Sequence, residues 1–331
     1  MATYLVTGGA GFIGAHIVRA LLGRGDRVRV LDNFSTGSRE NVPSHTGLEL
    51  IEGDVRSYHT VREAVEGVHF VLHQAALPSI PRSIRDPITS NDVNVVGTLN
   101  LLNASRDARV ARFVYASSSS IYGRNAELPK RETMMPLPIS PYAVSKLAGE
   151  NYCRAFTELY GFETVILRYF NIFGPLQNPN SQYSAVVPLF IRALLMGRSP
   201  TIFGDGSQTR DFTYVENAVQ ANLAACVAPG LGGRVFNIAS GNRVSVLDML
   251  RELESIVGEP VTPLFNAGRI GDVPHSYADI GAAQAAFGYQ VTVDFREGLQ
   301  RTVTAMQRDL GNGGVDDALR LAAPAVTAAR A

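Results

Sequence analysis

The sequence predicts an α/β protein with a doubly wound parallel sheet and a smaller C-terminal α/β lobe. The first half alternates short apolar runs, which end in small or polar residues, with segments of helical periodicity. That alternation is typical of buried parallel strands joined by crossover helices. A glycine-rich turn separates the first apolar run from the first helical segment. Ligands of such sheets lie beyond the carboxyl ends of the strands, so the informative residues should follow the apolar runs.

The expected elements follow in chain order. Apolar runs predict strands at residues 3–8, 27–32, 48–54, 69–76 and 112–118. Helical periodicity predicts helices at residues 12–25, 58–67 and 91–108. Residues 175–184 and 203–212 are rich in turn formers, whereas residues 232–241 predict one more strand of the main sheet.

These elements suggest how the chain divides. We expect a main domain over residues 1–175, to which residues 211–242 return. Residues 176–210 and 243–308 should form the smaller lobe, which closes over the ligand. The Gly- and Ala-rich tail at residues 309–331 is expected to be frayed or loosely docked.

Composition narrows the function. The 331 residues carry a net charge of +0, which gives no electrostatic reason to expect nucleic acid or an anionic membrane as a partner. Cys153 and Cys226 lie far apart, without metal spacing, so we expect a reducing cytoplasm. The start lacks the pattern of a secretory signal, and no apolar run approaches the roughly 18 residues of a membrane span. His69 and His73 alternate with apolar residues, which favours a core role; we expect no metal.

The turn "TGGAGFIG" predicts a dinucleotide site on a Rossmann sheet. Its glycines allow a tight turn and a close approach of backbone to pyrophosphate, and the helix that follows offers free N–H groups. Asp32 ends the second predicted strand, where a carboxylate binds the adenosine ribose. A carboxylate there repels a 2′-phosphate, so the expected cofactor is NAD rather than NADP.

Tyr142 and Lys146 are four residues apart on a predicted helix and should share a face. A free tyrosine is a poor base, with a pKa of about 10. A nearby ammonium and a positive nicotinamide both favour the phenolate, so Tyr142 is a candidate base. One serine of "SSSS", at the end of a predicted strand, can share the reacting oxygen with the tyrosine.

Together the motifs "TGGAGFIG", "LDNFSTG", "GDV", "HQAA", "SSSSIYG", "SPYAVSK", "LRYFNIFGP" and "RDFTYV" resemble the extended short-chain dehydrogenases/reductases. More narrowly, residues 1 to about 305 resemble the nucleotide-sugar 4-epimerases, in the branch that acts on UDP-N-acetylhexosamines. The resemblance implies the catalytic residues Ser118, Tyr142 and Lys146. For the cofactor it implies Gly8, Gly11, Phe12, Ile13, Asp32, Asn33, Ser35, Thr36, Gly37, Asp54, Val55, Ala75, Ala76, Asn94, Tyr142, Lys146 and Tyr169. For the substrate it implies Ser79, Ser118, Ser119, Tyr142, Asn171, Phe203, Arg210, Arg269, Asp272 and Ser276.

Two positions bear on the substrate. Pro78 stands where glucose-preferring epimerases commonly have a lysine, as the resemblance implies. The family position that carries a bulky tyrosine in strict glucose/galactose enzymes falls on Ser276, which leaves volume for a 2-acetamido group. Tyr277 is adjacent, so a shift of one residue in the alignment would reverse this prediction.

Alternative reactions need other groups. In the related 4,6-dehydratases an Asp–Glu pair follows the catalytic hydroxyl residue; here Ser119 and Ser120 stand there, which disfavours dehydration. A decarboxylase would need an arginine for the uronate, and Arg82 is the nearby candidate.

We therefore expect an isomerase that epimerises UDP-hexoses at C4 through a 4-keto sugar. Its substrates would be UDP-N-acetylglucosamine/UDP-N-acetylgalactosamine and the UDP-glucose/UDP-galactose pair. A UDP-glucuronate 4-epimerase, another nucleotide-sugar modifying enzyme and an NAD-binding sensor without activity are the alternatives. Family members commonly dimerise through two helices per subunit, which predicts a homodimer.

Overall fold

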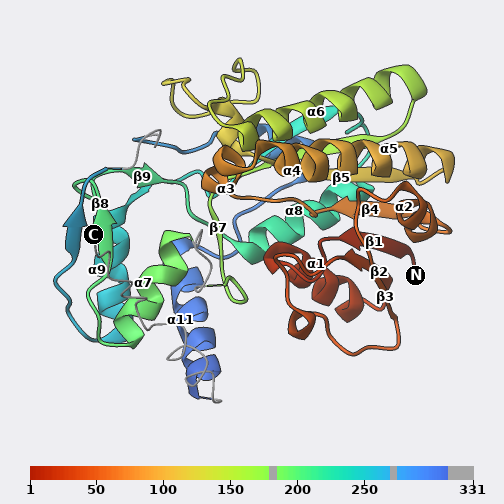
Figure 1. Ribbon diagram of the computed structural model, residues 1–331. Coiled ribbons are helices and arrows are strands. Elements are labelled where there is room, and N and C mark those ends of the chain that lie inside the picture. The colour runs from red at the N-terminus through yellow and green to blue at the C-terminus, as the bar shows by residue number, and fades with distance from the viewer. Residues whose placement is uncertain (179–184, 269–273, 312–331) are drawn as a thin grey trace, which may run out of the picture.

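The structure is a computed structural model that describes residues 1–178, 185–268 and 274–311. A seven-stranded sheet forms its centre, with the strand order β11-β6-β5-β4-β1-β2-β3, and every pairing in it is parallel (Figure 1). The strands are β1 (Thr3–Thr7), β2 (Arg27–Asp32), β3 (Leu48–Glu52), β4 (Phe70–His73), β5 (Arg112–Ser118), β6 (Thr164–Tyr169) and β11 (Arg234–Ile238). The predicted fold class is confirmed.

Helices cover both faces of the sheet, and successive side chains of each strand point to opposite faces. In β1, Tyr4 and Val6 pack with helix α1, whereas Leu5 packs into a second core with helices α2, α5 and α6. In β5, Val114 packs in the core that contains α1, and Tyr115 packs in the second core. The helices are α1 (Phe12–Gly23), α2 (Tyr58–Val65), α5 (Gly97–Asp107), α6 (Pro141–Tyr160) and α8 (Val215–Val227).

The helix expected at residues 91–108 begins earlier and is not uniform. Helix α4 (Pro87–Asn91) leads through a π-helical turn (Asp92–Val96) into α5. Asp86 caps α4 by accepting a hydrogen bond from Thr89 N (3.0 Å), and Pro87 fits the first turn because its missing N–H would have no partner there.

Strand β6 was not predicted, although its neighbour β11 was. All six residues of β6 are buried. Its sequence TVILRY does not alternate apolar and polar residues, and a short run without alternation cannot be told from a buried helical segment by periodicity. Its place between β5 and β11 carries the sheet one strand further than the first half of the chain predicts.

The remaining described elements lie outside the central sheet. They are α3 (Ile80–Arg85), α7 (Val186–Leu195), α9 (Val246–Val257), α10 (Gly281–Phe287), α11 (Phe295–Gly311) and the 3-10 turns η1 (Arg39–Asn41) and η3 (Ser119–Tyr122). Three two-stranded sheets pair β7 (Ile172–Phe173) with β10 (Thr213–Tyr214), β9 (Thr209–Arg210) with β12 (Val244–Ser245), and β8 (Thr201–Phe203) with β13 (Leu264–Asn266).

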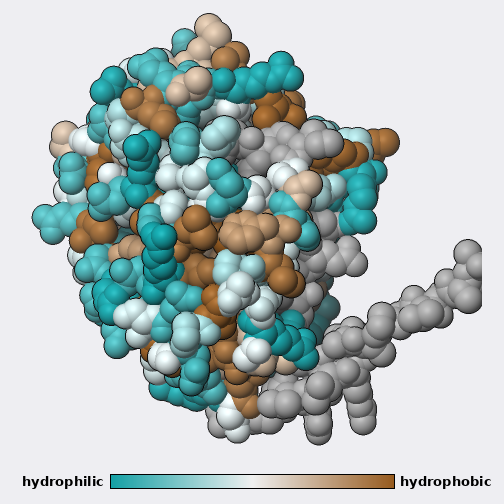
Figure 2. Space-filling model, turned by 90° about the vertical axis from the view of Figure 1, so that its left-hand side faces the viewer, coloured by the Kyte–Doolittle hydropathy of each residue, from teal (hydrophilic) through white to brown (hydrophobic). Residues whose placement is uncertain are grey.

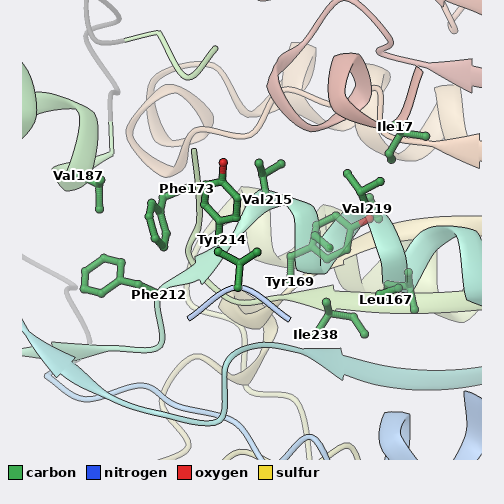
Figure 3. Close-up of a cluster of buried hydrophobic side chains, with 14 of the residues drawn as sticks. Ile17, Leu167, Tyr169, Phe173, Val187, Phe212, Tyr214, Val215, Val219 and Ile238 are labelled. Carbon is green, nitrogen blue, oxygen red and sulfur yellow. The ribbon is translucent and has the colours of Figure 1, made fainter. Parts of the chain in front are cut away.

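One core joins the sheet to the smaller lobe. Ile17 of α1 and Leu167 of β6 belong to the same buried cluster as Val187 of α7 and Phe212 (Figure 3). The ring of Phe173 meets that of Phe212 edge-on, with ring centres 6.4 Å apart. Because this core is shared, the division into a main domain and a lobe stays a prediction.

The face at the left of Figure 1 carries a band of hydrophobic side chains bordered by hydrophilic ones (Figure 2). Leu264 and Phe265 of β13 are exposed. Among the described helices, none is both long enough and apolar enough to cross a membrane.

Candidate active site

A cavity of about 1020 Å³ opens at the carboxyl ends of the central strands. Its size is at the upper end of ligand pockets. It extends from the glycine turn after β1, past the ends of β2, β4 and β5, to α6 and the smaller lobe. Its wall contains these predicted residues: Gly8, Gly11, Phe12, Ile13, Asp32, Asn33, Ser35, Thr36, Gly37, Val55, Ala75, Ala76, Ser79, Ser118, Ser119, Tyr142, Lys146, Tyr169, Asn171, Arg210 and Ser276.

The glycine turn is shaped so that side chains do not fit. Gly8 has φ +69°, and a Cβ on it would lie 2.7 Å from Ala75 N. A Cβ on Gly14 would lie 2.1 Å from Gly8 O, so α1 packs directly on the turn. Helix α1 begins at Phe12 with its N-terminus at the cavity. Free N–H groups and the positive end of the helix dipole favour a pyrophosphate there.

Asp32 is held at the end of β2 by two backbone donors. Ala10 N donates to Oδ2 (2.9 Å) and Phe34 N donates to Oδ1 (2.8 Å). Each carboxylate oxygen keeps a further lone pair for a ribose hydroxyl. Arg39, the cation that could favour a 2′-phosphate, is paired with Glu52 and lies over the Phe34 ring, 4.2 Å from its centre. These groups fit NAD.

Two predicted cofactor residues, Asp54 and Asn94, are not among the residues that line the cavity. The Asp54 carboxylate is paired with Arg56 (2.7 Å), whose hydrogen bonds help to lower the pKa of Asp54 to about 2. Asn94, in the π-helical turn, accepts a hydrogen bond from Leu77 N (2.8 Å) and donates to Ser145 Oγ (3.0 Å). Both side chains are engaged with protein groups, and their role toward a cofactor stays a prediction.

Helix α6 brings Tyr142 and Lys146 to the cavity. Ser140 caps the helix by accepting a hydrogen bond from Ala143 N (3.2 Å), and Pro141 occupies the first turn. Both predicted residues are buried, and Lys146 Nζ donates to Ala116 O on β5 (2.7 Å). This hydrogen bond holds the ammonium close to the end of the strand that carries the serines.

Burial acts on both groups. It lowers the pKa of Lys146 to about 8. It raises the pKa of Tyr142, and a hydrogen bond with Ser118 acts in the opposite direction. The sequence suggested that Lys146 and a positive nicotinamide together bring the pKa of Tyr142 towards neutrality. The groups of the chain alone do not do so. A positive nicotinamide beside the phenol would favour the ionised form.

The serine run turns sharply at the end of β5. Ser118 Oγ accepts hydrogen bonds from Ser120 N (3.2 Å) and Ser120 Oγ (2.9 Å), which starts the turn η3. Ser118, Ser119 and Ser120 all line the cavity. Among the described residues, the one carboxylate on the wall is Asp32, which ends β2 and is not part of the serine turn after β5.

The structure separates Ser276 from its neighbour Tyr277. Ser276 lines the cavity, and its N–H donates to Thr209 O (3.0 Å). Tyr277 is not on the wall; its ring lies beneath the guanidinium of Arg243, 5.7 Å from the ring centre. The residue with the small side chain is thus the one that faces the cavity.

Four other residues predicted to bind the substrate differ in where they lie. Ser79 lines the cavity and caps α3 through Arg82 N (3.1 Å). Phe203 lies on β8 and is not part of the wall. Arg269 and Asp272 fall outside the described residues.

Several residues of the wall were not singled out from the sequence for these roles. They include Gln74, Arg82, Tyr122, Lys130, Gln177 and Asn178. Gln74 follows β4 directly, a position that the strand-end rule could have flagged. Its Oε1 accepts a hydrogen bond from the hydroxyl of Tyr169 (3.2 Å), which orients that ring.

His73 has the core role that was expected. Its ring nitrogens are hydrogen-bonded to Thr7 Oγ1 (2.7 Å) and Thr98 Oγ1 (2.9 Å). Burial lowers the pKa of His73 to about 3, so the ring is neutral near neutral pH.

Known proteins share this sequence and fold. UDP-glucose 4-epimerase of Mycolicibacterium smegmatis is 38% identical over 304 residues, which cover 90% of this chain and 96% of that protein. A structure of UDP-N-acetylglucosamine 4-epimerase from Methanobrevibacter ruminantium, in complex with UDP-N-acetylmuramic acid, has a TM-score of 0.89 at 36% identity and covers 93% of this chain and 99% of that one. UDP-glucuronic acid 4-epimerase from Bacillus cereus, in complex with UDP-glucuronic acid and NAD, has a TM-score of 0.86 at 32% identity and covers 92% and 99%.

A sequence model of the NAD dependent epimerase/dehydratase family matches residues 4–239, more than two thirds of the chain. The predictions of an extended short-chain dehydrogenase/reductase, of an isomerase of the nucleotide-sugar 4-epimerase class and of NAD as cofactor are confirmed. The chain belongs to the NAD-dependent epimerase/dehydratase family.

Proposed function

We propose that this enzyme interconverts UDP-N-acetylglucosamine and UDP-N-acetylgalactosamine, and also UDP-glucose and UDP-galactose. The observation that supports the acetylated pair is the position of Ser276 on the wall of the cavity, with Tyr277 turned towards Arg243. A small side chain there leaves room for a 2-acetamido group. The relatives named above act on several UDP-sugars, so they support the UDP-sugar class rather than one sugar.

The serine turn argues for epimerisation rather than dehydration. Elimination of water needs an acid and a base beside the sugar, and Ser119 and Ser120 line the cavity where a carboxylate pair would be required. A serine hydroxyl cannot accept that proton near neutral pH. A 4-keto sugar formed here has no acidic side chain on the described wall near β5 to divert it.

The residues of α6 and β5 then have distinct tasks. Tyr142 takes the proton of the C4 hydroxyl and later returns it, while Ser118 donates a hydrogen bond to the same oxygen. Charged Lys146 favours the phenolate form of Tyr142. The glycine turn and Asp32 would hold NAD, which would supply the reversible redox chemistry at C4. Inversion requires that the sugar turn over while UDP stays bound, which fits a cavity with small hydroxyls around the sugar.

Product analysis by NMR tests this proposal. The purified enzyme, supplied with NAD, is incubated separately with UDP-N-acetylglucosamine, UDP-glucose and UDP-glucuronate. We expect C4 epimers from the first two. Conversion of UDP-glucuronate alone would contradict the proposal, and conversion of none would contradict the enzymatic function itself.

UDP-glucuronate is the second candidate substrate because a cation, Arg82, lies on the wall next to Ser79. If Arg82 binds a uronate, Arg82→Gln should raise KM for UDP-glucuronate by about tenfold or more. It should leave KM for UDP-N-acetylglucosamine within about twofold.

A further inference from the structure

Lysine is rare in this chain. Of its 30 lysines and arginines, only Lys130 and Lys146 are lysines. Both are buried and both line the cavity. Each ammonium binds backbone oxygens: Lys146 that of Ala116 (2.7 Å), and Lys130 those of Asn125 and Glu127 (2.8 Å for Glu127). Both lysines therefore link the cavity wall to main-chain oxygens of the surrounding elements.

We propose that Glu150 and Arg168 are positioning residues for the epimerase reaction. They stand at the centre of a buried polar network that joins the regions of the two lysines, and they hold the catalytic helix against the rest of the cavity wall. The proposal rests on the proposed function, because turnover of a UDP-hexose is one of its measurements.

One end of the network holds α6 against β5. Tyr142, Lys146 and Glu150 follow at intervals of four residues and share one face of α6. Glu150 is 0% exposed, and its carboxylate accepts hydrogen bonds from Ser117 Oγ (2.5 Å) and from Arg168 Nε (2.9 Å) and Nη2 (2.7 Å). Ser117 directly precedes Ser118. Glu150 therefore fixes the strand end that carries the catalytic hydroxyl relative to the helix that carries the base.

The other end reaches the proposed specificity position. Arg168 Nη1 donates to the hydroxyl of Tyr122 (2.9 Å), which donates to Asn237 Oδ1 (2.7 Å). Asn237 Nδ2 donates to Lys130 O (2.9 Å), and Lys130 N donates to Tyr277 O (2.9 Å). The network thus ends at Tyr277, the residue next to Ser276, which lines the cavity.

Glu150 also supplies charge. The titratable or charged groups that face Lys146 and Glu150 are Tyr142 and Cys153 on α6, Tyr115 on β5, His73 on β4, Arg168 on β6 and Tyr122 in η3. Burial keeps His73 neutral and raises the pKa of Tyr115 and Cys153 well above their ordinary values. Near neutral pH, Glu150 is therefore the anion that opposes the effect of burial on the pKa of Lys146.

Three variants separate charge from geometry. Glu150→Gln removes the anion but leaves Arg168 buried without its counter-charge, which can prevent folding. The double variant Glu150→Gln/Arg168→Gln removes both charges together. Ser117→Ala removes one hydrogen bond and keeps the anion. Glu216→Gln, which removes a carboxylate from the exposed pair with Arg301 (2.8 Å), is the matched control.

The measurements are kcat and KM for the UDP-hexose that the wild type converts, as functions of pH, and NMR of protein labelled in lysine. The chain has two lysines, so Lys146 can be titrated directly even if no UDP-sugar is converted. In the folded double variant we expect kcat to fall by about tenfold to a hundredfold with KM within about threefold. The alkaline limb of kcat and the Lys146 titration should both move to lower pH, because of the two charges removed it is that of Glu150, one helical turn from Lys146, that raises the pKa of Lys146. Ser117→Ala should lower kcat without moving that limb.

A folded double variant whose Lys146 titration and kcat match those of the Glu216→Gln control overturns the proposal. If kcat of the double variant falls while its thermal midpoint stays near that of the wild type, a role in stability alone is excluded and the proposal is supported. If the wild type converts no UDP-sugar, the proposed function fails, and the Lys146 titration alone decides whether Glu150 sets the charge of the site.

Discussion

Tyr142 and Ser118 share the cavity wall at the end of β5 and the start of α6. If Tyr142 moves the C4 proton, Tyr142→Phe should lower kcat by about 10² to 10⁴-fold, the range for a lost acid–base group. UDP binding should persist, because the change removes one hydroxyl and leaves the ring. Isothermal titration with UDP and a turnover assay measure the two properties; unchanged turnover would refute the base assignment.

Lys146 makes the pH dependence testable. Burial lowers its pKa to about 8 in the folded chain, so the unfolded chain binds this proton more tightly. Between about pH 8 and pH 10 the free energy of unfolding should therefore rise with pH through this group. Lys146→Met should be more stable than the wild type near neutral pH, and this advantage should shrink as pH rises to about 10. Urea unfolding at both pH values measures it; a constant difference would contradict the buried charge.

Ser276 sets the width of the pocket in our proposal. Ser276→Tyr should reduce kcat/KM for UDP-N-acetylglucosamine by about tenfold or more, because the ring fills the space for the acetamido group. UDP-glucose should be affected less, and Ser276→Ala, which keeps the space, is the control. Equal losses for both substrates would show that pocket width is not the cause.

At the scale of elements, the junction of β1 and α1 depends on the absence of side chains. Gly14→Ala would place a methyl group 2.1 Å from Gly8 O, so the turn must shift. We expect NAD affinity to fall by at least about tenfold and stability by roughly 1–3 kcal/mol, as for overpacking. Gly23→Ala in the same helix meets nothing within 4 Å and should be neutral or stabilise by up to about 1 kcal/mol. NAD titration and urea unfolding of both variants test this; equal behaviour would contradict the close-packing argument.

Elements also differ in how far the sequence predicts them. The strands before β6 were recognised because small or polar residues end each apolar run. The π-helical turn was not separated from α5, since a local change from α to π hydrogen bonding leaves the apolar periodicity almost unchanged, and the short helix α4 before it was not predicted. Strand β6 lacks alternation because both of its faces are buried.

At the scale of the whole molecule, α6 leaves an apolar face uncovered. Val144, Tyr152 and Leu159 of α6 are exposed, as is Val96 beside α5. We infer that a second copy of the chain covers this face, as the resemblance implies. Light scattering should then give about twice the mass of 35.6 kDa.

Two matched substitutions test the dimer. Val144→Glu places a charge in the proposed interface and should yield monomers. Phe265→Glu is the control, because Phe265 is equally exposed (55% against 54%) but lies on β13. If neither variant changes the mass of a dimer, another face forms it; a monomeric wild type would contradict the inference.

The sequence by itself determined the fold class and the cofactor class, and it predicts that Tyr142 and Lys146 share one face of a helix. Those features depend on local chemistry: glycines in a turn, a carboxylate at a strand end, and a tyrosine and lysine one helical turn apart. Tertiary structure alone decided that Ser276 rather than Tyr277 meets the cavity, and that Glu150 pairs with Arg168. Each of these depends on which residues distant in the chain meet one another. One sequence read alone holds no direct record of such contacts.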